Sequence, residues 1–249
     1  MTNVLIIGNG QIGDSLHNLY NGLNKKYNIY IKDIEEGKDI PKDIDVLHIC
    51  YGYSKSFIED TILYLETYKP SITMIHSTTP LKTTKAISSS TPYNVVHTPV
   101  IGCHPNLTES LVTFVKMVGG YNDEAIETAC NHLVDIGITP VIYNSPEETE
   151  AAKMLSTTYY GWNIMFMKEV KRYCEENYLD FENVYEATNH LYNEGYKALG
   201  INNVKRPVLK YMSGKIGGHC VRPNMELLKD SFYPAKIGIE LDDKEMGSD

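Results

Sequence analysis

The stretch "VLIIGNGQIG" (residues 4–13) decides the predicted fold of the N-terminal half. Apolar residues typical of a buried strand lead into Gly8, Gly10 and Gly13, and a helical pattern follows at once. In this G-x-G-x-x-G spacing the first glycine permits a tight turn, the second lets the backbone approach a pyrophosphate, and the third lets helix and strand pack closely. The helix N-terminus then favours an anion. We therefore predict a dinucleotide site at Gly8, Gly10, Gln11, Ile12 and Gly13.

An acidic residue further along the chain indicates which dinucleotide is bound. Asp33 closes the next predicted strand, about 20 residues after the glycine loop. A carboxylate at this place binds the ribose hydroxyls of adenosine and repels the 2′-phosphate of NADP, although the neighbouring Lys32 weakens that repulsion. We predict NAD as the cofactor, and the alternative is a glycine-rich turn without a ligand.

Short apolar runs alternate with helical patterns through the rest of this half. Strands are predicted at 3–8, 28–33, 45–50, 72–77, 94–99, 114–120 and 139–144, and helices at 12–23, 56–67, 81–89 and 122–136. This alternation indicates βαβ units and a parallel sheet buried on both faces. We predict an α/β fold, with a Rossmann-type doubly wound parallel sheet in an NAD-binding domain at 1–145.

The pattern changes after residue 145. Ser145 and Pro146 are typical of a helix start, and apolar residues then recur at helical spacing to about residue 178. Shorter helices are predicted near 181–193 and 205–212, and the acidic end at 238–249 is expected to fray. We predict a smaller all-helical domain at 146–249 with a long central helix. Such a helix needs a partner to cover it, which favours a homodimer.

Composition excludes several classes of protein. The formal charge of −9 argues against a general nucleic-acid binder, and no apolar run reaches the roughly 20 residues of a membrane span. The five cysteines are odd in number and scattered, which is typical of reduced thiols. We therefore expect a cytoplasmic protein that binds neither nucleic acid nor membrane.

Further motifs carry a resemblance. Glu150, Lys153 and Thr157 share one helix face, which taken alone indicates a solvated Glu–Lys pair. Together with "STTPLKTT" (77–84), the later N-I-x-F-x-x-E pattern (163–169) and "GGHC" (217–220), the chain resembles the UDP-glucose/GDP-mannose dehydrogenase family, within the 6-phosphogluconate dehydrogenase-like superfamily. The resemblance covers roughly residues 3–225. It implies a homodimer.

The resemblance also implies roles for single residues. In that family NAD oxidises an alcohol twice to a carboxylate, so that Lys153 is expected to stabilise an oxyanion and Cys220 to trap the aldehyde. Thr78 is expected beside the nicotinamide. The chemistry is physically reasonable, because a thiolate attacks carbonyl carbon well and fixed positive charge stabilises oxyanions.

Three departures from the family pattern affect the acid/base groups. Thr157 replaces an Asn, Asn224 replaces an Asp that could accept a proton, and Val100 replaces a Glu. Only about 25 residues follow Asn224, so the sequence resembles a short form lacking the C-terminal nucleotide-sugar-binding domain. The expected substrate is a small anionic molecule such as a nucleotide-sugar. The basic residues Lys205, Arg206, Lys210, Lys215 and Arg222 are either its anion contacts or a solvated surface.

Histidines could replace the missing acid/base groups. His97, His104 and His219 are predicted in loops facing the site, and His104 is the best candidate to replace the Glu. The spacing of the histidines and cysteines matches no compact zinc pattern, so no metal is predicted.

Three functions stay open at this stage. The first is the NAD-dependent oxidation with Lys153 and Cys220 at the reacting carbon. The second is a single hydride transfer, as in the related β-hydroxyacid and 6-phosphogluconate dehydrogenases, which the loss of the Asp and Glu favours. The third is a non-catalytic dinucleotide-binding protein, against which the retained Lys153 and "GGHC" argue.

Overall fold

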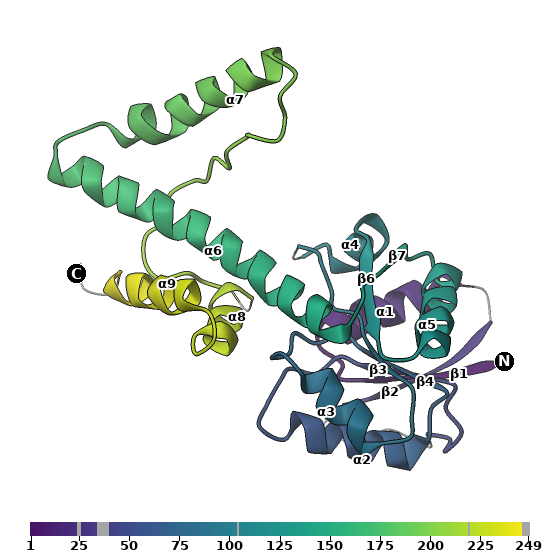
Figure 1. The fold of residues 1–249 in the computed structure, drawn as a ribbon. Coiled ribbons are helices and arrows are strands. Elements are labelled where there is room, and N and C mark those ends of the chain that lie inside the picture. Colours follow the sequence, from purple (N-terminus) through teal and green to yellow (C-terminus); the bar gives the residue numbers. More distant parts are fainter. Residues whose placement is uncertain (24–25, 34–39, 104, 219, 246–249) are drawn as a thin grey trace. The chain divides into compact units, whose positions relative to one another are not determined.

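The computed structural model describes residues 1–23, 26–33, 40–103, 105–218 and 220–245. The chain divides into two compact units, Met1–Lys153 and Met154–Asp249 (Figure 1). Each unit is described by itself. No helix in the described ranges combines the length and apolar character needed to cross a membrane.

The first unit is built on a seven-stranded sheet with the order β2-β1-β3-β4-β5-β6-β7. The strands are β1 (Thr2–Ile7), β2 (Tyr27–Lys32), β3 (Val46–Ile49), β4 (Ile72–Ile75), β5 (Val95–His97), β6 (Lys116–Gly120) and β7 (Pro140–Ile142). Strands β1 to β5 are all parallel to their neighbours among these five, and Val4 of β1 lies opposite both Ile29 of β2 and Val46 of β3. The predicted doubly wound fold is confirmed.

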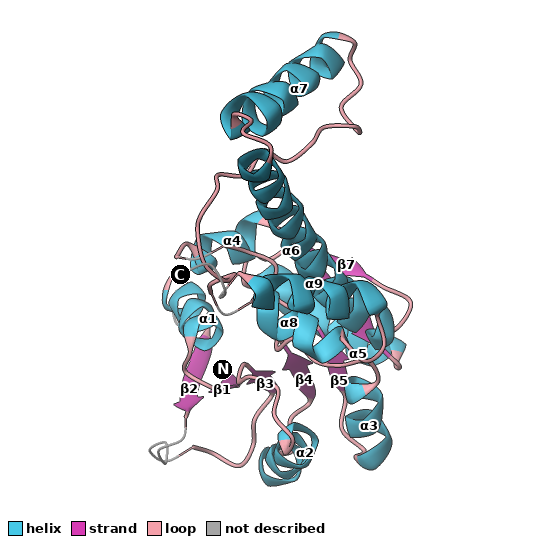
Figure 2. Ribbon diagram, turned by 90° about the vertical axis from the view of Figure 1, so that its left-hand side faces the viewer, coloured by secondary structure: helices cyan, strands magenta, loops and turns pink. Residues whose placement is uncertain are grey.

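Helices cover both faces of this sheet, as Figure 2 shows for α2 and α3 below the strands. One face packs against α1 (Gln11–Asn21), α4 (Leu107–Thr113) and α5 (Asp123–Asp135), and the other against α2 (Phe57–Tyr68) and α3 (Thr83–Ser90). Strand β1 shows why: Val4 and Ile6 belong to the first core, and Leu5 and Ile7 to the second. Alternate side chains of a strand point to opposite faces, so a strand buried on both faces is apolar throughout.

The predicted parallel sheet is observed in all strand pairings of the described residues but one. Strand β6 runs antiparallel to β5, with Val96 opposite Gly120, and β7 then runs parallel to β6. A buried antiparallel strand has the same apolar composition as a parallel one, so the sequence pattern could not distinguish them.

The long helix α6 (Pro146–Glu176) starts in the first unit and continues into the second. The second unit also contains the π-helical turn η1 (Glu182–Ala187), α7 (Thr188–Ala198), α8 (Val221–Leu228) and α9 (Tyr233–Lys244). Two small cores hold it together, one around Met154, Met225 and Leu228, and one around Cys174, Phe181 and Tyr185. The expected all-helical character of this part is therefore observed in the described residues.

Two predictions for the second unit are wrong. Residues 205–212 form no helix, because Pro207 disfavours helical backbone at the preceding Arg206. The Asn193 side chain bonds the nitrogen and the carbonyl of Arg206 (2.8 Å each), and the Tyr185 hydroxyl donates to the Pro207 carbonyl (3.4 Å). Residues 238–245, expected to fray, belong mostly to helix α9, whose Ala235 and Asp242 are buried.

Candidate functional site

The glycine loop between β1 and α1 has a geometry that demands glycine at two positions. Gly8 has φ +95°, and a Cβ there would lie 2.7 Å from the Tyr51 nitrogen. A Cβ on Gly13 would lie 1.9 Å from the Gly8 carbonyl oxygen. The loop therefore turns tightly and packs against the end of β3, as the sequence pattern predicts.

Gly10 differs from Gly8 and Gly13, because no atom lies within 4 Å of the place that a Cβ would occupy. It caps helix α1 with extended backbone (φ −76°, ψ −168°), and Asn9, Gly10 and Gln11 are exposed while Ile12 is half-buried. The first N–H groups of a helix have no partner within it and attract anions. Open space above Gly10 at this helix end fits the pyrophosphate of a dinucleotide.

Asp33 lies next to this loop at the end of β2. Its carboxylate accepts a hydrogen bond from the Asn9 nitrogen (3.2 Å), while the Gly8 nitrogen donates to the Lys32 carbonyl (2.8 Å). The carboxylate thus lies at the same sheet edge as the glycine loop. This arrangement fits the ribose of a bound dinucleotide.

The segment 77–84 is fixed by a buried carboxylate. Glu150, fully buried on α6, accepts hydrogen bonds from the Lys82 nitrogen (2.6 Å), the Thr84 nitrogen (2.8 Å) and the Thr84 hydroxyl (2.7 Å). It therefore caps the N-terminus of α3. Burial raises the pKa of Glu150, and the hydrogen bonds from Thr84 and Lys82 oppose this shift. The interpretation of Glu150 as part of a solvated pair is wrong.

Thr78 stands in this fixed segment, half-buried, three residues after the end of β4. The preceding Ser77 is buried and donates its hydroxyl proton to the Tyr51 carbonyl (2.5 Å). Thr78 therefore lies at the carboxyl edge of the sheet, which also carries the glycine loop and Asp33. In open α/β sheets this is the edge at which ligands bind.

The sequence suggested that His97 lies in a loop facing the site, and the structure places it elsewhere. It ends strand β5, is fully buried, and its Nδ1 lies 2.7 Å from the Thr149 hydroxyl while Nε2 lies 3.0 Å from the Ser77 carbonyl. Burial lowers its pKa to about 4. A neutral imidazole held on both sides links β5, α6 and the Thr78 segment.

Lys153 is half-buried on α6 at the end of the first unit. Its positive charge lowers the pKa of His97 and the pKa of Lys116 on β6, and in both cases burial is the larger cause. The charge of the predicted catalytic lysine therefore acts on buried groups at the carboxyl edge of the sheet in the first unit.

Lys116 is a feature that the sequence analysis missed. The side chain is 2% exposed and its Nζ has no hydrogen-bond partner among the described residues. Burial lowers its pKa to about 7. A charged ammonium without a partner is costly in such a place, so the folded state favours the neutral amine. Only burial distinguishes this lysine from a solvated one, and the sequence "FVKMVGG" did not indicate it.

Replacing Lys116 by methionine is expected to stabilise the protein at neutral pH. The folded-state pKa of Lys116 lies below the unfolded value of 10.5, so this lysine lowers the free energy of unfolding when it is protonated in the unfolded chain. This destabilisation is absent above about pH 10.5 and complete below about pH 7. At about 1.4 kcal/mol per pKa unit, the shift from 10.5 to about 7 gives an expected gain of roughly 4–5 kcal/mol near pH 7 that shrinks as the pH rises. Denaturant unfolding of both proteins at several pH values between 7 and 10 measures the difference. A pH-independent difference would contradict the buried-amine account.

Three further predicted site residues, Cys220, Asn224 and Thr157, lie in the second unit. Cys220 precedes helix α8 as a half-buried free thiol, and Asn224 follows one turn later, its nitrogen donating to the Cys220 carbonyl (3.2 Å). Asn224 is buried, and its Nδ2 has no partner among the described residues. Thr157 is half-buried on α6. His104 and His219 lie outside the described residues.

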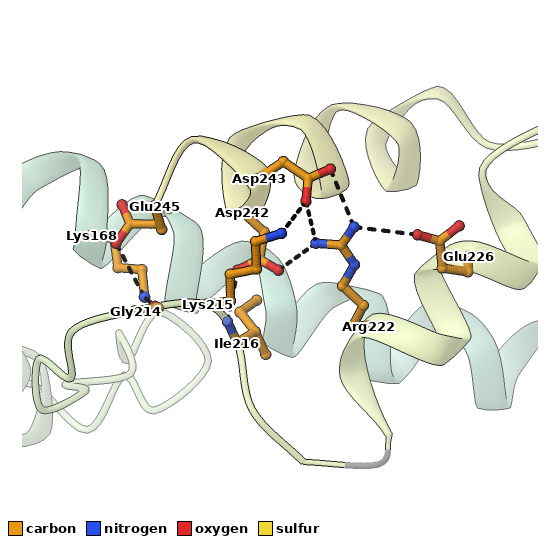
Figure 3. A network of polar contacts seen from close by, with 9 residues as sticks. All are labelled: Lys168, Gly214, Lys215, Ile216, Arg222, Glu226, Asp242, Asp243 and Glu245. Carbon is orange, nitrogen blue, oxygen red and sulfur yellow. Dashed lines mark hydrogen bonds and ion pairs between the residues drawn. The ribbon is translucent and has the colours of Figure 1, made fainter. Parts of the chain in front are cut away.

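An ion-pair network anchors the segment that leads to Cys220 (Figure 3). Arg222 lies 2.7 Å from the buried Asp242 and 3.0 Å from Asp243, while Asp242 accepts from the Ile216 nitrogen (2.7 Å). Lys215 pairs with Asp243 (2.6 Å). The sequence left Lys215 and Arg222 open between anion contacts and a solvated surface, and in the structure both side chains form ion pairs with helix α9.

Replacing Asp242 by asparagine is expected to destabilise the second unit by about 3 kcal/mol, because Arg222 loses its buried partner. The matched change of Asp243, whose side chain is 48% exposed, should cost less than about 1 kcal/mol. Thermal and denaturant unfolding of both variants measure the two costs. Equal effects would contradict the dominance of the buried pair.

Metal binding finds no support in the described ranges, where no group of three or more His, Cys, Asp and Glu side chains is arranged to hold an ion.

Comparisons with solved structures show what this fold resembles. The UDP-D-ManNAc dehydrogenase of Pyrococcus horikoshii matches with a TM-score of 0.78 and 16% identity, over 98% of this chain and 69% of that one. The UDP-glucose dehydrogenase of Pyrobaculum islandicum matches at 0.71 and 13%, over 98% and 68%. The 3-hydroxyisobutyrate dehydrogenase of Mycobacterium tuberculosis, solved with L-serine, matches at 0.69 and 12%, over 99% and 93%.

These likenesses confirm the predicted resemblance at the level of the fold. The chain spans about two thirds of the length of the sugar-nucleotide dehydrogenases that it matches, and nearly the whole hydroxyacid dehydrogenase. No protein-family model matches the sequence, and no curated protein matches it.

Proposed function

We propose that this protein is an NAD-dependent oxidoreductase that acts on a CH–OH group of a small anionic substrate. The observation that carries the proposal is the loop Gly8–Gly13, which requires glycine at two positions and leaves open space above a third, with Asp33 beside it. When bound, the dinucleotide supplies a hydride acceptor. The fold shared with dehydrogenases supports the assignment.

The residues of this chain have defined roles in the proposal. The N-terminus of α1 holds the pyrophosphate, and the carboxylate of Asp33 holds the adenosine ribose and disfavours a 2′-phosphate. Thr78, in the segment that Glu150 fixes, borders the nicotinamide. Lys153 stabilises negative charge on the substrate oxygen. Cys220 is the candidate nucleophile for a second oxidation step.

A single hydride transfer is the second candidate, and two buried residues favour it. Val100, at the position of the family's Glu, is 5% exposed within the first core and offers no proton acceptor. Asn224, at the position of the family's Asp, is equally buried and its amide cannot serve as a base. His104 is the candidate that the sequence offers in their place.

Counting NADH formed per substrate molecule tests both candidates. The substrates to try first are UDP-N-acetylmannosamine, UDP-glucose, L-serine and 3-hydroxyisobutyrate, each with NAD and with NADP. Two NADH per molecule, reduced to one by Cys220→Ser, establishes the two-step oxidation. One NADH, unaffected by Cys220→Ser, establishes the single transfer. A dinucleotide that binds without turnover of any substrate favours the non-catalytic alternative.

We also infer a homodimer through helix α6, whose large side chains are exposed along one stripe. Tyr159 is 68% exposed, Phe166 64% and Tyr173 59%, at spacings of seven residues. Rows of exposed aromatic residues mark association surfaces. Light scattering at micromolar concentration should give twice the chain mass of 28.2 kDa, and a monomeric mass would refute the dimer.

A further inference from the structure

A row of hydrogen-bonded side chains crosses the interior of the first unit. His132 Nε2 of α5 lies 2.5 Å from the hydroxyl of Tyr20 on α1, and that hydroxyl lies 2.7 Å from Nε2 of His48 on β3. His48 Nδ1 lies 2.8 Å from Nε2 of His76, at the end of β4. All four side chains are at least nine-tenths buried. Three links therefore join four groups that can each gain and lose a proton.

The two ends of the row have different surroundings. His132 is 8% exposed and lies within the field of the surface pair Lys26–Asp135. His76 is 1% exposed and directly precedes Ser77 and Thr78 at the carboxyl edge of the sheet. The row thus leads from beneath the surface pair Lys26–Asp135 to the edge that carries the candidate site.

The His76 end opens onto further unpaired polar atoms. His76 Nδ1, Thr98 Oγ1 and Lys116 Nζ are buried without partners among the described residues. Met74, Val96 and Val118 all belong to the first core. His76, Thr98 and Lys116 each lie two residues from one of them on the same strand or its extension. Residues two apart on a strand point to the same face, so these three side chains face the same side of the sheet. The charge of Lys116 acts on His76. Buried unpaired polar groups are rare in proteins and call for a functional or solvent explanation.

The hydrogen bonds of the row can run in two directions. In one, His76 Nε2–H donates to His48, His48 Nε2–H donates to Tyr20, and the Tyr20 hydroxyl donates to His132 Nε2, which leaves His76 Nδ1 bare. In the other, every bond is reversed, His76 Nδ1 carries the proton and His132 Nδ1 is bare. Both arrangements contain only neutral groups, and they differ by one proton moved from end to end.

Neutral imidazoles are what the surroundings favour. Burial lowers the pKa of His48 and of His76 well below the usual value, and positive charge on Lys116 adds to both shifts. His132 also lowers the pKa of His48, whereas the backbone of Thr98 opposes the pKa shift of His76. Burial also lowers the pKa of His132 to about 4, with Asp135 opposing and Lys26 adding to the shift. Tyr27 and Cys50 also act on the row, through Tyr20, whose pKa burial raises well above its usual value.

We propose that His76, His48, Tyr20 and His132 form a proton relay that carries a proton from the carboxyl edge of the sheet to the surface beside Asp135. The relay's use in catalysis rests on the dehydrogenase function proposed above. When an alcohol is oxidised, the C–H hydrogen leaves as hydride to the nicotinamide dinucleotide and the O–H proton must leave separately. That proton enters at His76 Nδ1, each link shifts one proton, and the Nδ1–H of His132 passes its proton to water.

The relay is tested by ¹⁵N NMR of the histidine side chains in the full chain, without substrate. A working relay populates both bond directions, so the two ring nitrogens of His48 should give averaged or exchange-broadened resonances. Tyr20→Phe removes the hydroxyl through which exchange runs and should leave His48 in one fixed tautomer. Tyr27→Phe is the matched control: its hydroxyl is buried and makes no hydrogen bond to the relay side chains among the described residues, and its ring lies 5.2 Å from that of Tyr20.

Three outcomes would overturn the relay. One is a single fixed tautomer of His48 in the wild-type protein, and another is exchange that persists in Tyr20→Phe. The third is the loss of exchange in the Tyr27→Phe control. Should Tyr20→Phe fail to fold, His132→Gln cuts the surface end of the row and is expected to abolish the exchange in the same way.

Single turnovers with a pH indicator connect the relay to catalysis. In the wild-type protein the released proton should appear together with NADH, whereas in Tyr20→Phe it should lag behind NADH by about tenfold in rate. NADH and proton appearing together in that variant would remove the relay from catalysis. If no substrate yields NADH while the NMR exchange is present, the proposed dehydrogenase function fails and the proton-conducting row stands.

Discussion

A protein in which Gly10 is replaced by alanine is expected to fold as stably as the wild type and to bind NAD about 10- to 100-fold more weakly. The backbone of Gly10 has extended dihedral angles that alanine adopts freely, and nothing lies within 4 Å of the new methyl group. The methyl group would occupy the space that the pyrophosphate needs against the helix N-terminus. The loss should therefore appear in binding alone.

Two controls separate this effect from damage to the fold. Gly13→Ala places its Cβ 1.9 Å from the Gly8 carbonyl oxygen and should lower stability as well as binding. Gly195→Ala adds a methyl group to open space on α7, so it should leave NAD binding unchanged and raise stability by up to about 1 kcal/mol, because alanine is the better helix former. Thermal unfolding with and without NAD reads out both quantities, because a ligand raises the melting temperature by mass action. An unchanged NAD-induced shift in Gly10→Ala would mean that the dinucleotide does not lie over this loop.

Replacing Lys153 by alanine is expected to lower kcat by about 10²–10³-fold with little change in the affinity for NAD. Lys153 belongs to the carboxyl edge of the sheet, where its charge acts on both Lys116 and His97. The account assigns that charge to the substrate oxygen, on which negative charge develops during oxidation. The measurement is kcat and KM of each protein with the substrate that the NADH assay identifies.

A matched pair of variants checks the assignment. Lys153→Arg keeps the positive charge and should retain part of the activity, whereas Lys85→Ala removes an exposed lysine of α3 and should retain all of it. The assignment of Lys153 to the reacting oxygen is wrong if Lys153→Ala turns over at the wild-type rate.

Local patterns were sufficient to predict the sheet and the glycine loop. Strand β1, the turn at Gly8 and the start of α1 are adjacent in the chain, so spacing alone identified them. Helix α4 escaped prediction because its seven residues give too little periodicity. The segment 205–212 shows the opposite failure, since apolar spacing suggested a helix although Pro207 disfavours helical backbone at Arg206.

The buried polar groups could not be predicted, because tertiary packing creates them. Tyr20 and His132 are 112 residues apart in the chain, and His48 and His76 are 28 apart. Lys116 looks like any lysine near a strand start, and only the packing of the first core removes it from water. Glu150 and Lys153 show the same limit: their spacing predicted one helix face, whereas the contacts of Glu150 to Lys82 and Thr84 depend on the position of α3.

The most direct test of the central claim is a calorimetric titration of the wild-type protein with NAD and, separately, with NADP. The account predicts one NAD bound per chain with a dissociation constant below about 1 mM, and weaker binding of NADP because of Asp33. Absence of binding by either dinucleotide at millimolar concentration would contradict the account, since the loop at Gly8–Gly13 would then be a turn without a ligand.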